Sequence, residues 1–226
     1  MNKLEKQVRA FVYAKFLESA HPPMAEEIMA KFSLERPETA QLLKSLEAQK
    51  GLALLKGTDR ILMAWPFSAI ASPFVVKLDN GKEYFANCAW DAVAFHVMLE
   101  AWVEIRSFCH HSGAKIEVRI SSSGQAETDP TGVLVYLAKP ANQWWVDIID
   151  ACSNTMVFFA GGRELEAWLS EVQAAASGVT LSIEQTILLS QPIYKGRMNL
   201  DYERTSAEEI RKHFAEMNLT GPFWDL

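Results

Sequence analysis

The chain has 226 residues, of which 49% are hydrophobic and 22% are charged, so it can form a substantial core as one large domain or as a small domain joined to a medium one. The formal net charge of -6 excludes a nucleic-acid surface over the whole protein and leaves room only for a local basic patch. No apolar stretch reaches membrane-spanning length, and the first residues lack the apolar segment of a signal peptide. We therefore expect a cytoplasmic protein whose three cysteines stay reduced.

The first part of the chain is predicted to be helical. Apolar residues repeat at helical spacing over residues 4–19, 24–32 and 36–49, and two short apolar runs follow at 52–56 and 60–64. Three helices followed by a hairpin is the order of a winged helix-turn-helix, a module that often reads DNA through its third helix. Here the basic residues of the third helix are matched by glutamates, so we expect a structural cap and no DNA binding.

The rest of the chain mixes strand and helix patterns. An Asp79-Asn80-Gly81 turn between two apolar runs predicts a hairpin. We expect strands at 74–78, 82–86, 115–120, 132–137 and 155–160, a polar loop at 121–131, a short helix or turn at 144–151, and helices over 88–106, 163–176, 182–190 and from Thr205 or Ser206 onward.

Together these elements predict an α+β fold in three parts. A winged-helix-like three-helix cap spans residues 1–65, and a mixed or antiparallel sheet core flanked by helices spans residues 66–198. Residues 199–226 form a C-terminal extension whose aromatic end is expected to dock on the core.

Cys88 and Asp91 stand one helical turn apart where a helix is expected to begin. Unpaired N–H groups at a helix N-terminus lower the pKa of a thiol, and the thiolate is the form that attacks electrophiles and binds soft metals. Asp91 projects from nearly the same face and can carry a proton. A buried structural cysteine followed by an acidic first turn explains the same residues, and locally the two interpretations weigh about the same.

The other two cysteines give weaker local signals. Cys152 lies among acidic neighbours just before an expected strand, which favours a buried structural thiol. Cys109 precedes His110 and His111, a combination that can bind zinc, but no second pair at metal-binding spacing accompanies it. We therefore expect no zinc site.

The order of the motifs resembles that of the organomercurial (alkylmercury) lyases over roughly residues 20–190. The Cys-Ala-x-Asp step at 88–91 and the thiol at 152 ahead of Phe158-Phe159-Ala160 carry most of the specificity of this resemblance. A winged-helix-like segment before both also matches that family's architecture. The other matching motifs are Trp65-Pro66-Phe67-Ser68, Phe85-Ala86-Asn87, Ser107-Phe108-Cys109-His110-His111-Ser112-Gly113-Ala114 and Trp168.

The resemblance implies a carbon–mercury lyase in which Cys88, Asp91 and Cys152 are catalytic. The two thiolates would bind the mercury of R–Hg⁺, with Asp91 as a further candidate ligand, and Asp91 would deliver the proton to carbon. This chain has one residue more than the family pattern between Cys152 and Phe158, so Ser153 is the alternative occupant of the second position. If both thiols bind one mercury, their sulfurs should lie about 3.5–5 Å apart.

The resemblance also implies which small molecules and partners take part. Mercury is part of the substrate and of the product, and no added cofactor is needed. Small cellular thiols would remove the mercuric product, and a mercuric reductase is a possible acceptor. We expect neither a membrane nor a DNA partner. Cys109 matches a structural cysteine of the family, and the apolar pocket is expected to draw on Trp90, Phe95, Phe158 and Phe159.

Two other functions stay open at this point. A family relative could use Cys88 and Asp91 on another thiol-reactive, alkyl–metalloid or sulfur-containing substrate, which the displaced Cys152 and the longer tail would favour. A winged-helix protein could instead sense a metal or a thiol-reactive ligand. The N-terminal helices favour such a sensor and the acidic net charge speaks against it.

Overall fold

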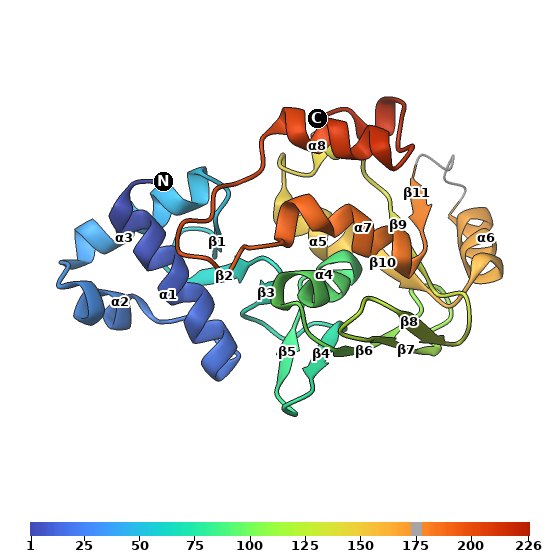
Figure 1. Cartoon of the computed structure of the whole chain (residues 1–226), viewed down its shortest axis with the longest axis horizontal. Coiled ribbons are helices and arrows are strands. Elements are labelled where there is room, and N and C mark those ends of the chain that lie inside the picture. The colour runs from blue at the N-terminus through green and yellow to red at the C-terminus, as the bar shows by residue number, and fades with distance from the viewer. Residues whose placement is uncertain (173–177) are drawn as a thin grey trace.

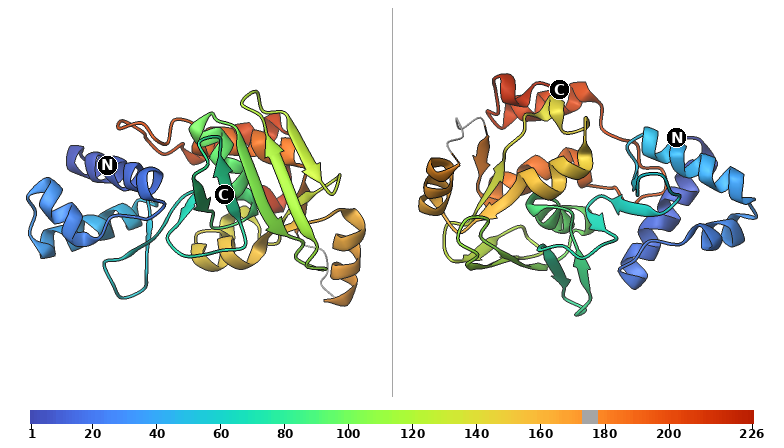
Figure 2. Two further views of the ribbon diagram at one scale, coloured as in Figure 1. Left: turned by 90° about the horizontal axis from the view of Figure 1, so that it is seen from below. Right: turned by 180° about the vertical axis from the view of Figure 1, so that it is seen from behind.

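The computed structural model describes residues 1–172 and 178–226 as helices and antiparallel sheets (Figures 1 and 2). The helices are α1 (Lys3–Ser19), α2 (Ala25–Phe32), α3 (Arg36–Ala48), α4 (Ala89–Leu99), α5 (Ile148–Thr155), α6 (Gly162–Glu171), α7 (Ile183–Tyr194) and α8 (Ala207–Glu216), with 3₁₀ turns at Ala141–Gln143 and Pro222–Trp224. The strands are β1 (Ala53–Leu54), β2 (Ile61–Ala64), β3 (Phe67–Ser68), β4 (Val75–Leu78), β5 (Glu83–Phe85), β6 (Val103–Phe108), β7 (Lys115–Ile120), β8 (Ala126–Asp129), β9 (Leu134–Leu137), β10 (Met156–Phe159) and β11 (Val179–Leu181).

The N-terminal helices and the first small sheet follow the expected element order. Asn2 caps α1 in a reciprocal capping box with Glu5, and Pro37 stands in the first turn of α3, where a missing N–H costs nothing. The sheet β1-β2-β3 continues past residue 65, because Phe67 and Ser68 pair with β2. The winged-helix assignment and the division at residues 65 and 198 stay predictions.

The core is built around α4. A five-stranded antiparallel sheet, in the order β5-β4-β6-β7-β8, lies on one side of this helix and α7 lies on the other (Figure 1). Every residue from Ala89 to Met98 is buried, as expected of a helix that is enclosed by neighbours. The N-terminus of α4, and with it Cys88, therefore lies inside the protein. The third sheet, β10-β9-β11, completes the α+β core.

The helix predicted over 88–106 is wrong beyond Leu99. Glu100 adopts a left-handed conformation and ends α4, and the chain then returns as β6 between β4 and β7. The residues of β6 alternate between buried and more exposed positions, as in a sheet with one covered face.

Two smaller predictions also need correction or restriction, and one strand was missed. The loop predicted over 121–131 contains β8, which pairs with β7, and β11 was not predicted at all. The helix predicted over 163–176 ends at Glu171 in α6, while residues 173–176 lie outside the described part of the chain.

The C-terminal segment packs on the core. Ser206 caps α8 by accepting a hydrogen bond from the N–H of Glu209, and α8 lies against α7 (Figure 1). Trp224 is buried, with its ring centroid 5.0 Å from that of Phe214 and 6.4 Å from that of Trp144. Within the described residues, none of the helices combines the length and the apolar character needed to cross a membrane.

Candidate active site

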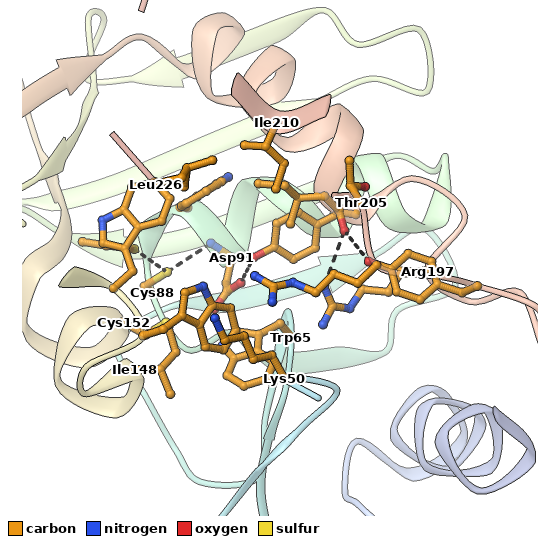
Figure 3. A pocket seen from close by; sticks show the side chains of 18 residues that line it. Lys50, Trp65, Cys88, Asp91, Ile148, Cys152, Arg197, Thr205, Ile210 and Leu226 are labelled. Atoms are coloured by element: carbon orange, nitrogen blue, oxygen red, sulfur yellow. Dashed lines mark hydrogen bonds between the residues drawn. The ribbon is translucent and has the colours of Figure 1, made fainter. Parts of the chain in front are cut away.

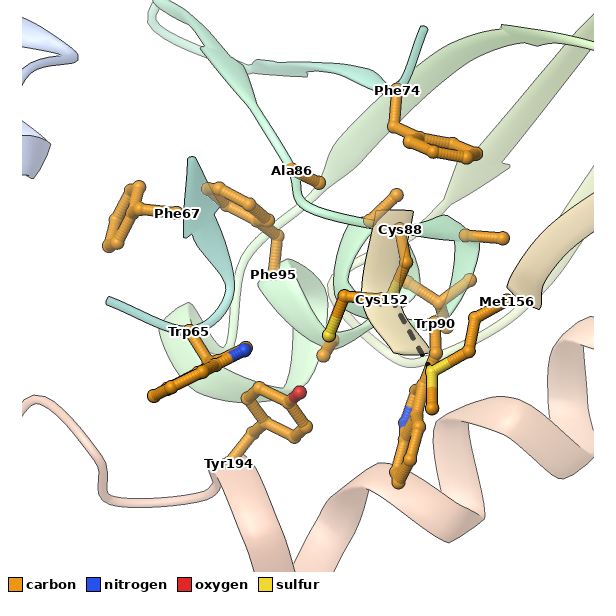
Figure 4. Packing of buried hydrophobic residues seen from close by; sticks show 14 of the residues in the cluster. Trp65, Phe67, Phe74, Ala86, Cys88, Trp90, Phe95, Cys152, Met156 and Tyr194 are labelled. Carbon is orange, nitrogen blue, oxygen red and sulfur yellow. Dashed lines mark hydrogen bonds between the residues drawn. The ribbon is translucent and has the colours of Figure 1, made fainter. Parts of the chain in front are cut away.

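Cys88, Asp91 and Cys152 converge in the centre of the molecule, although Cys152 is far from the other two in the sequence. One ligand atom from each residue lies within 4.8 Å of those of the other two, and all three side chains are buried. Figure 3 labels the three residues, and Figure 4 shows Cys88 and Cys152 among the buried apolar side chains. In the described part of the chain, this is the only group of three or more potential metal-binding side chains. The separation is compatible with one mercury ion held by both sulfurs.

The start of α4 positions the first two of these residues. Cys88 is the N-cap, and its Sγ accepts a hydrogen bond from the N–H of Asp91 at 3.3 Å. Sulfur is a weak acceptor, so this cap is a poor substitute for Ser or Asp. Its effect is to hold the thiol against the first turn, beside the carboxyl group.

Cys152 reaches the same point from α5. Asp147 caps this helix by accepting a hydrogen bond from the N–H of Asp150 at 3.0 Å. Successive residues of a helix point about 100° apart, so only one of two neighbours can face the site. Cys152 is buried there, whereas Ser153 is exposed, which places the thiol rather than the hydroxyl beside Cys88.

The Asp91 carboxyl group is held at both oxygens. Tyr194, at the end of α7, donates a hydrogen bond of 2.5 Å to Oδ1, and the Asn87 side-chain amide donates one of 3.0 Å to Oδ2. Asn87 is itself fixed by donating to the carbonyl oxygens of Pro66 and Phe67. These contacts fix the orientation of the carboxyl group relative to the two sulfurs.

Burial dominates the electrostatics of the site. It raises the pKa of Asp91 to about 6, although hydrogen bonds from Tyr194 and Asn87 work in the opposite direction. Burial, together with Cys152 and the negative charge of Asp91, raises the pKa of the Cys88 thiol well above its usual range. The prediction of a lowered pKa for Cys88 is therefore wrong, because the helix N-terminus sits in the core.

The three residues face a narrow pocket of about 70 Å³ (Figure 3). Tryptophans from separate segments form much of its wall: Trp65, Trp90, Trp144 and Trp145. Of the residues predicted to line the pocket, only Trp90 does so. Phe95, Phe158 and Phe159 are fully buried in the surrounding core.

Two further residues join the site without a clear signal in the sequence. Tyr194 lies beyond the helix predicted over 182–190, which α7 extends by four residues. Arg197 donates a hydrogen bond from Nε to the hydroxyl of Tyr13 at 2.7 Å, which ties the site to α1. Asn87 belongs to one of the motifs on which the resemblance rests. The hydrogen bond from its side chain to Asp91 is visible only in the folded structure.

Cys109 lies elsewhere, at the end of β6. Its Sγ accepts a hydrogen bond from the N–H of Ala160 at 3.4 Å. His111 pairs with the carboxylates of Glu164 and Glu171. Through these contacts Cys109 and His111 help to hold their loop against α6.

Comparisons with known proteins agree with this geometry. The alkylmercury lyase (MerB) family model matches residues 67–195, more than half of the chain. Alkylmercury lyase of Staphylococcus epidermidis is 23% identical over 157 residues, covering 70% of this chain and 69% of that one. Alkylmercury lyase of Bacillus cereus is 27% identical over 112 residues, and the match spans about half of each chain.

The fold has a solved counterpart. A crystal structure of the mercury-bound form of MerB2 superposes with a TM-score of 0.64 at 18% identity and covers 83% of this chain and 87% of that chain. The likeness at this identity concerns the fold, while the matched family model spans the segment from β3 to the end of α7. That segment contains both cysteines and the aspartate of the buried cluster, and the chain belongs to the alkylmercury lyase family.

Proposed function

We propose that this protein cleaves carbon–mercury bonds by protonolysis, with Cys88 and Cys152 as ligands to mercury and Asp91 as the proton donor. The observation that carries the proposal is the convergence of two buried sulfurs and one buried carboxyl group within 4.8 Å. Mercury is a soft metal that prefers thiolate to nitrogen or oxygen ligands, and the tryptophan-lined pocket suits an apolar organic group.

Metal binding and thiol deprotonation are linked in this scheme. A thiol that coordinates a metal loses its proton even when its pKa is otherwise high. The Asp91 carboxyl group, with a pKa of about 6, is mostly ionised at neutral pH and lies beside Cys88, so it can accept that proton.

The same carboxyl group then returns the proton to carbon. Two thiolates on one mercury increase the electron density at the attached carbon, and the Hg–C electron pair takes the proton from Asp91. General acid catalysis by a positioned group typically contributes about 10²–10⁴-fold to the rate. The products are the hydrocarbon R–H and Hg²⁺ held by Cys88 and Cys152, which small thiols in solution can remove by exchange.

Hydrocarbon release tests the proposal directly. Reduced protein incubated with phenylmercury in excess thiol should release benzene, and in D₂O the benzene should carry one deuterium. Cys88→Ser and Cys152→Ser should each abolish turnover, and Asp91→Asn should lower it by about 10²–10⁴-fold. No release by the wild-type protein with its thiols intact would refute the proposed function. Full activity of Cys152→Ser would instead favour a relative that uses Cys88 and Asp91 on another electrophile.

A further inference from the structure

The thiol pocket opens into a wider surface groove. This groove, of about 1020 Å³, runs between α3 and the start of α5. Lys50, Trp65, Trp145 and Ile148 line both the groove and the pocket, so they stand where the two meet. Figure 3 shows Lys50 and Trp65 together on one side of the pocket and Cys88 and Cys152 on another. Any molecule that comes from the groove must pass these residues.

Positive charges gather at this junction. The Lys50 ammonium and the Arg204 guanidinium each lie 4.7 Å from the centre of the Trp145 ring. Arg197 lines the same pocket. Across residues 1–172 and 178–226, none of these three side chains forms an ion pair with Asp or Glu, although the protein carries 28 acidic and 22 basic residues.

The cations are close enough to repel one another. Partial burial and the charge of Arg204 lower the pKa of Lys50. Arg204 is exposed by surface area, but desolvation by the atoms around its guanidinium and the charge of Arg197 likewise lower its pKa. Arg197 is close enough to Asp91 to feel its charge, whereas Lys50 and Arg204 form no ion pair with Asp or Glu in the described part of the chain. An anion that binds beside Lys50 and Arg204 would therefore relieve the repulsion between them.

The carboxylates that line the groove and the pocket are engaged elsewhere. Asp59 pairs with Arg36, and Leu226, which lines the pocket, accepts a hydrogen bond from Arg211 at 3.3 Å. Glu47 accepts a hydrogen bond from the N–H of Leu54 at 2.8 Å, and Asp147 caps α5. Asp91, inside the pocket, is held by Tyr194 and Asn87.

We propose that Lys50 and Arg204, which both contact the Trp145 ring, form an anion subsite for the carboxylate of a small thiol that carries the organomercurial to the pocket. This inference rests on the proposed function and specifies the form of its substrate, an adduct R–Hg–S–R′ in which R′ bears a carboxylate. The organic group R would enter the tryptophan-lined pocket while the carrier stays at the mouth.

The carrier leaves by exchange of thiolates. The Cys88 thiolate forms a bond to mercury, the Hg–S bond to the carrier breaks, and the carrier sulfur keeps that electron pair. With Cys152 as the second ligand, the whole reaction is R–Hg–SR′ + 2 Cys–SH → R–H + Hg(S–Cys)₂ + R′SH. One thiol proton reaches carbon and the other leaves on the carrier, so neither an oxidant nor a reductant is required.

Carriers of matched length and different charge test the subsite. Phenylmercury adducts of 3-mercaptopropionate, 2-mercaptoethanol and cysteamine carry a negative, neutral and positive group, respectively. We expect kcat/KM for benzene release to be roughly 3–10-fold higher for the anionic than for the neutral adduct at low salt, and to be lowest for the cationic one. Leaving-group strength alone gives the opposite order, because an ammonium group lowers the thiol pKa and a carboxylate raises it.

Variants of the two cations should remove the preference. Lys50→Gln and Arg204→Gln should each reduce the ratio of anionic to neutral kcat/KM, and the double variant should bring it to one or below. Lys212→Gln, which changes an exposed lysine in α8, is the matched control and should keep the wild-type ratio. Added salt should lower the wild-type ratio.

The outcomes separate the two proposals. A wild-type ratio at or below one, or a ratio that the double variant leaves intact, would overturn the subsite while benzene release still supports the lyase. No benzene from any of the three adducts would overturn the lyase itself. Circular dichroism checks that the variants are folded, and both substituted side chains lie outside the buried core.

Discussion

Replacing Tyr194 by Phe should shift the pH dependence of the reaction towards alkaline pH. The Tyr194 hydroxyl donates a hydrogen bond of 2.5 Å to Oδ1 of Asp91 and so stabilises the ionised carboxylate. In the proposed mechanism Asp91 must be ionised to accept the thiol proton, so kcat/KM should fall below a pKa of about 6 in the wild-type protein. Without the hydroxyl, the ionised form loses a donor and the pKa of Asp91 must rise.

The size of the shift follows from the strength of the bond. A hydrogen bond to a charged group contributes about 1.5–3 kcal/mol, which corresponds to about 1–2 pH units. The acidic limb of kcat/KM should therefore move from about 6 to about 7–8. At pH 7 the ionised fraction of Asp91 falls from about nine-tenths to between about one-tenth and one-half, so activity should drop roughly two- to tenfold and recover above pH 9.

The assay is hydrocarbon release from phenylmercury between pH 5 and pH 10, with thiol in excess at every pH. Tyr84→Phe is the matched control, since the Tyr84 hydroxyl donates to the carbonyl of Leu17 and has no contact with Asp91. Tyr84→Phe should leave the acidic limb in place. An acidic limb of Tyr194→Phe that coincides with that of the wild-type protein would refute the assignment of this limb to Asp91.

Two further predictions concern stability. The pKa of Asp91 is higher in the folded protein, about 6, than its ordinary 3.8, so its ionisation opposes folding above pH 6 and has no effect below about pH 4. Asp91→Asn should therefore raise the free energy of unfolding at pH 8 by up to roughly 3 kcal/mol in urea titrations while activity is lost, and an equal gain at pH 3.5 would contradict this origin. Cys109→Ala removes the acceptor of the Ala160 N–H and should lower the free energy of unfolding by about 1–3 kcal/mol. Its kcat/KM should stay within a factor of about three of wild type, and a larger loss would give Cys109 a role in the reaction.

The sequence predicted the pairing of Cys88 with Asp91 because that pairing is local. A spacing of three residues at the start of a helix is enough to bring two side chains to one face. The approach of Cys152 depends instead on how α5 and β10 pack against α4, and only the resemblance to a known family indicated it. Tyr194 is more than 100 residues from Asp91, and no local pattern marks a tyrosine as the partner of a buried carboxyl group.

The end of α4 could not be predicted for a related reason. Helices usually end near glycine or proline, and the segment after Leu99 contains neither until Gly113. The break falls instead on Glu100, which adopts a left-handed backbone that is uncommon for residues other than glycine. Pairing of β6 with both β4 and β7 outweighs the helical preference of this apolar stretch.

The raised pKa of the Cys88 thiol determines where the proton for carbon comes from in the proposed mechanism. At an exposed helix N-terminus the partial positive charge would favour a thiolate, but here the desolvation of a buried anion is the larger effect. Cys88 therefore keeps its proton in the resting site, next to a carboxylate that can accept it. A site with a preformed thiolate would bind mercury as well, but it would have to draw the proton for carbon from water through a narrow, tryptophan-lined pocket. In the proposed mechanism, mercury binding itself displaces the proton, and Asp91 carries it over a few ångströms to the carbon that is released.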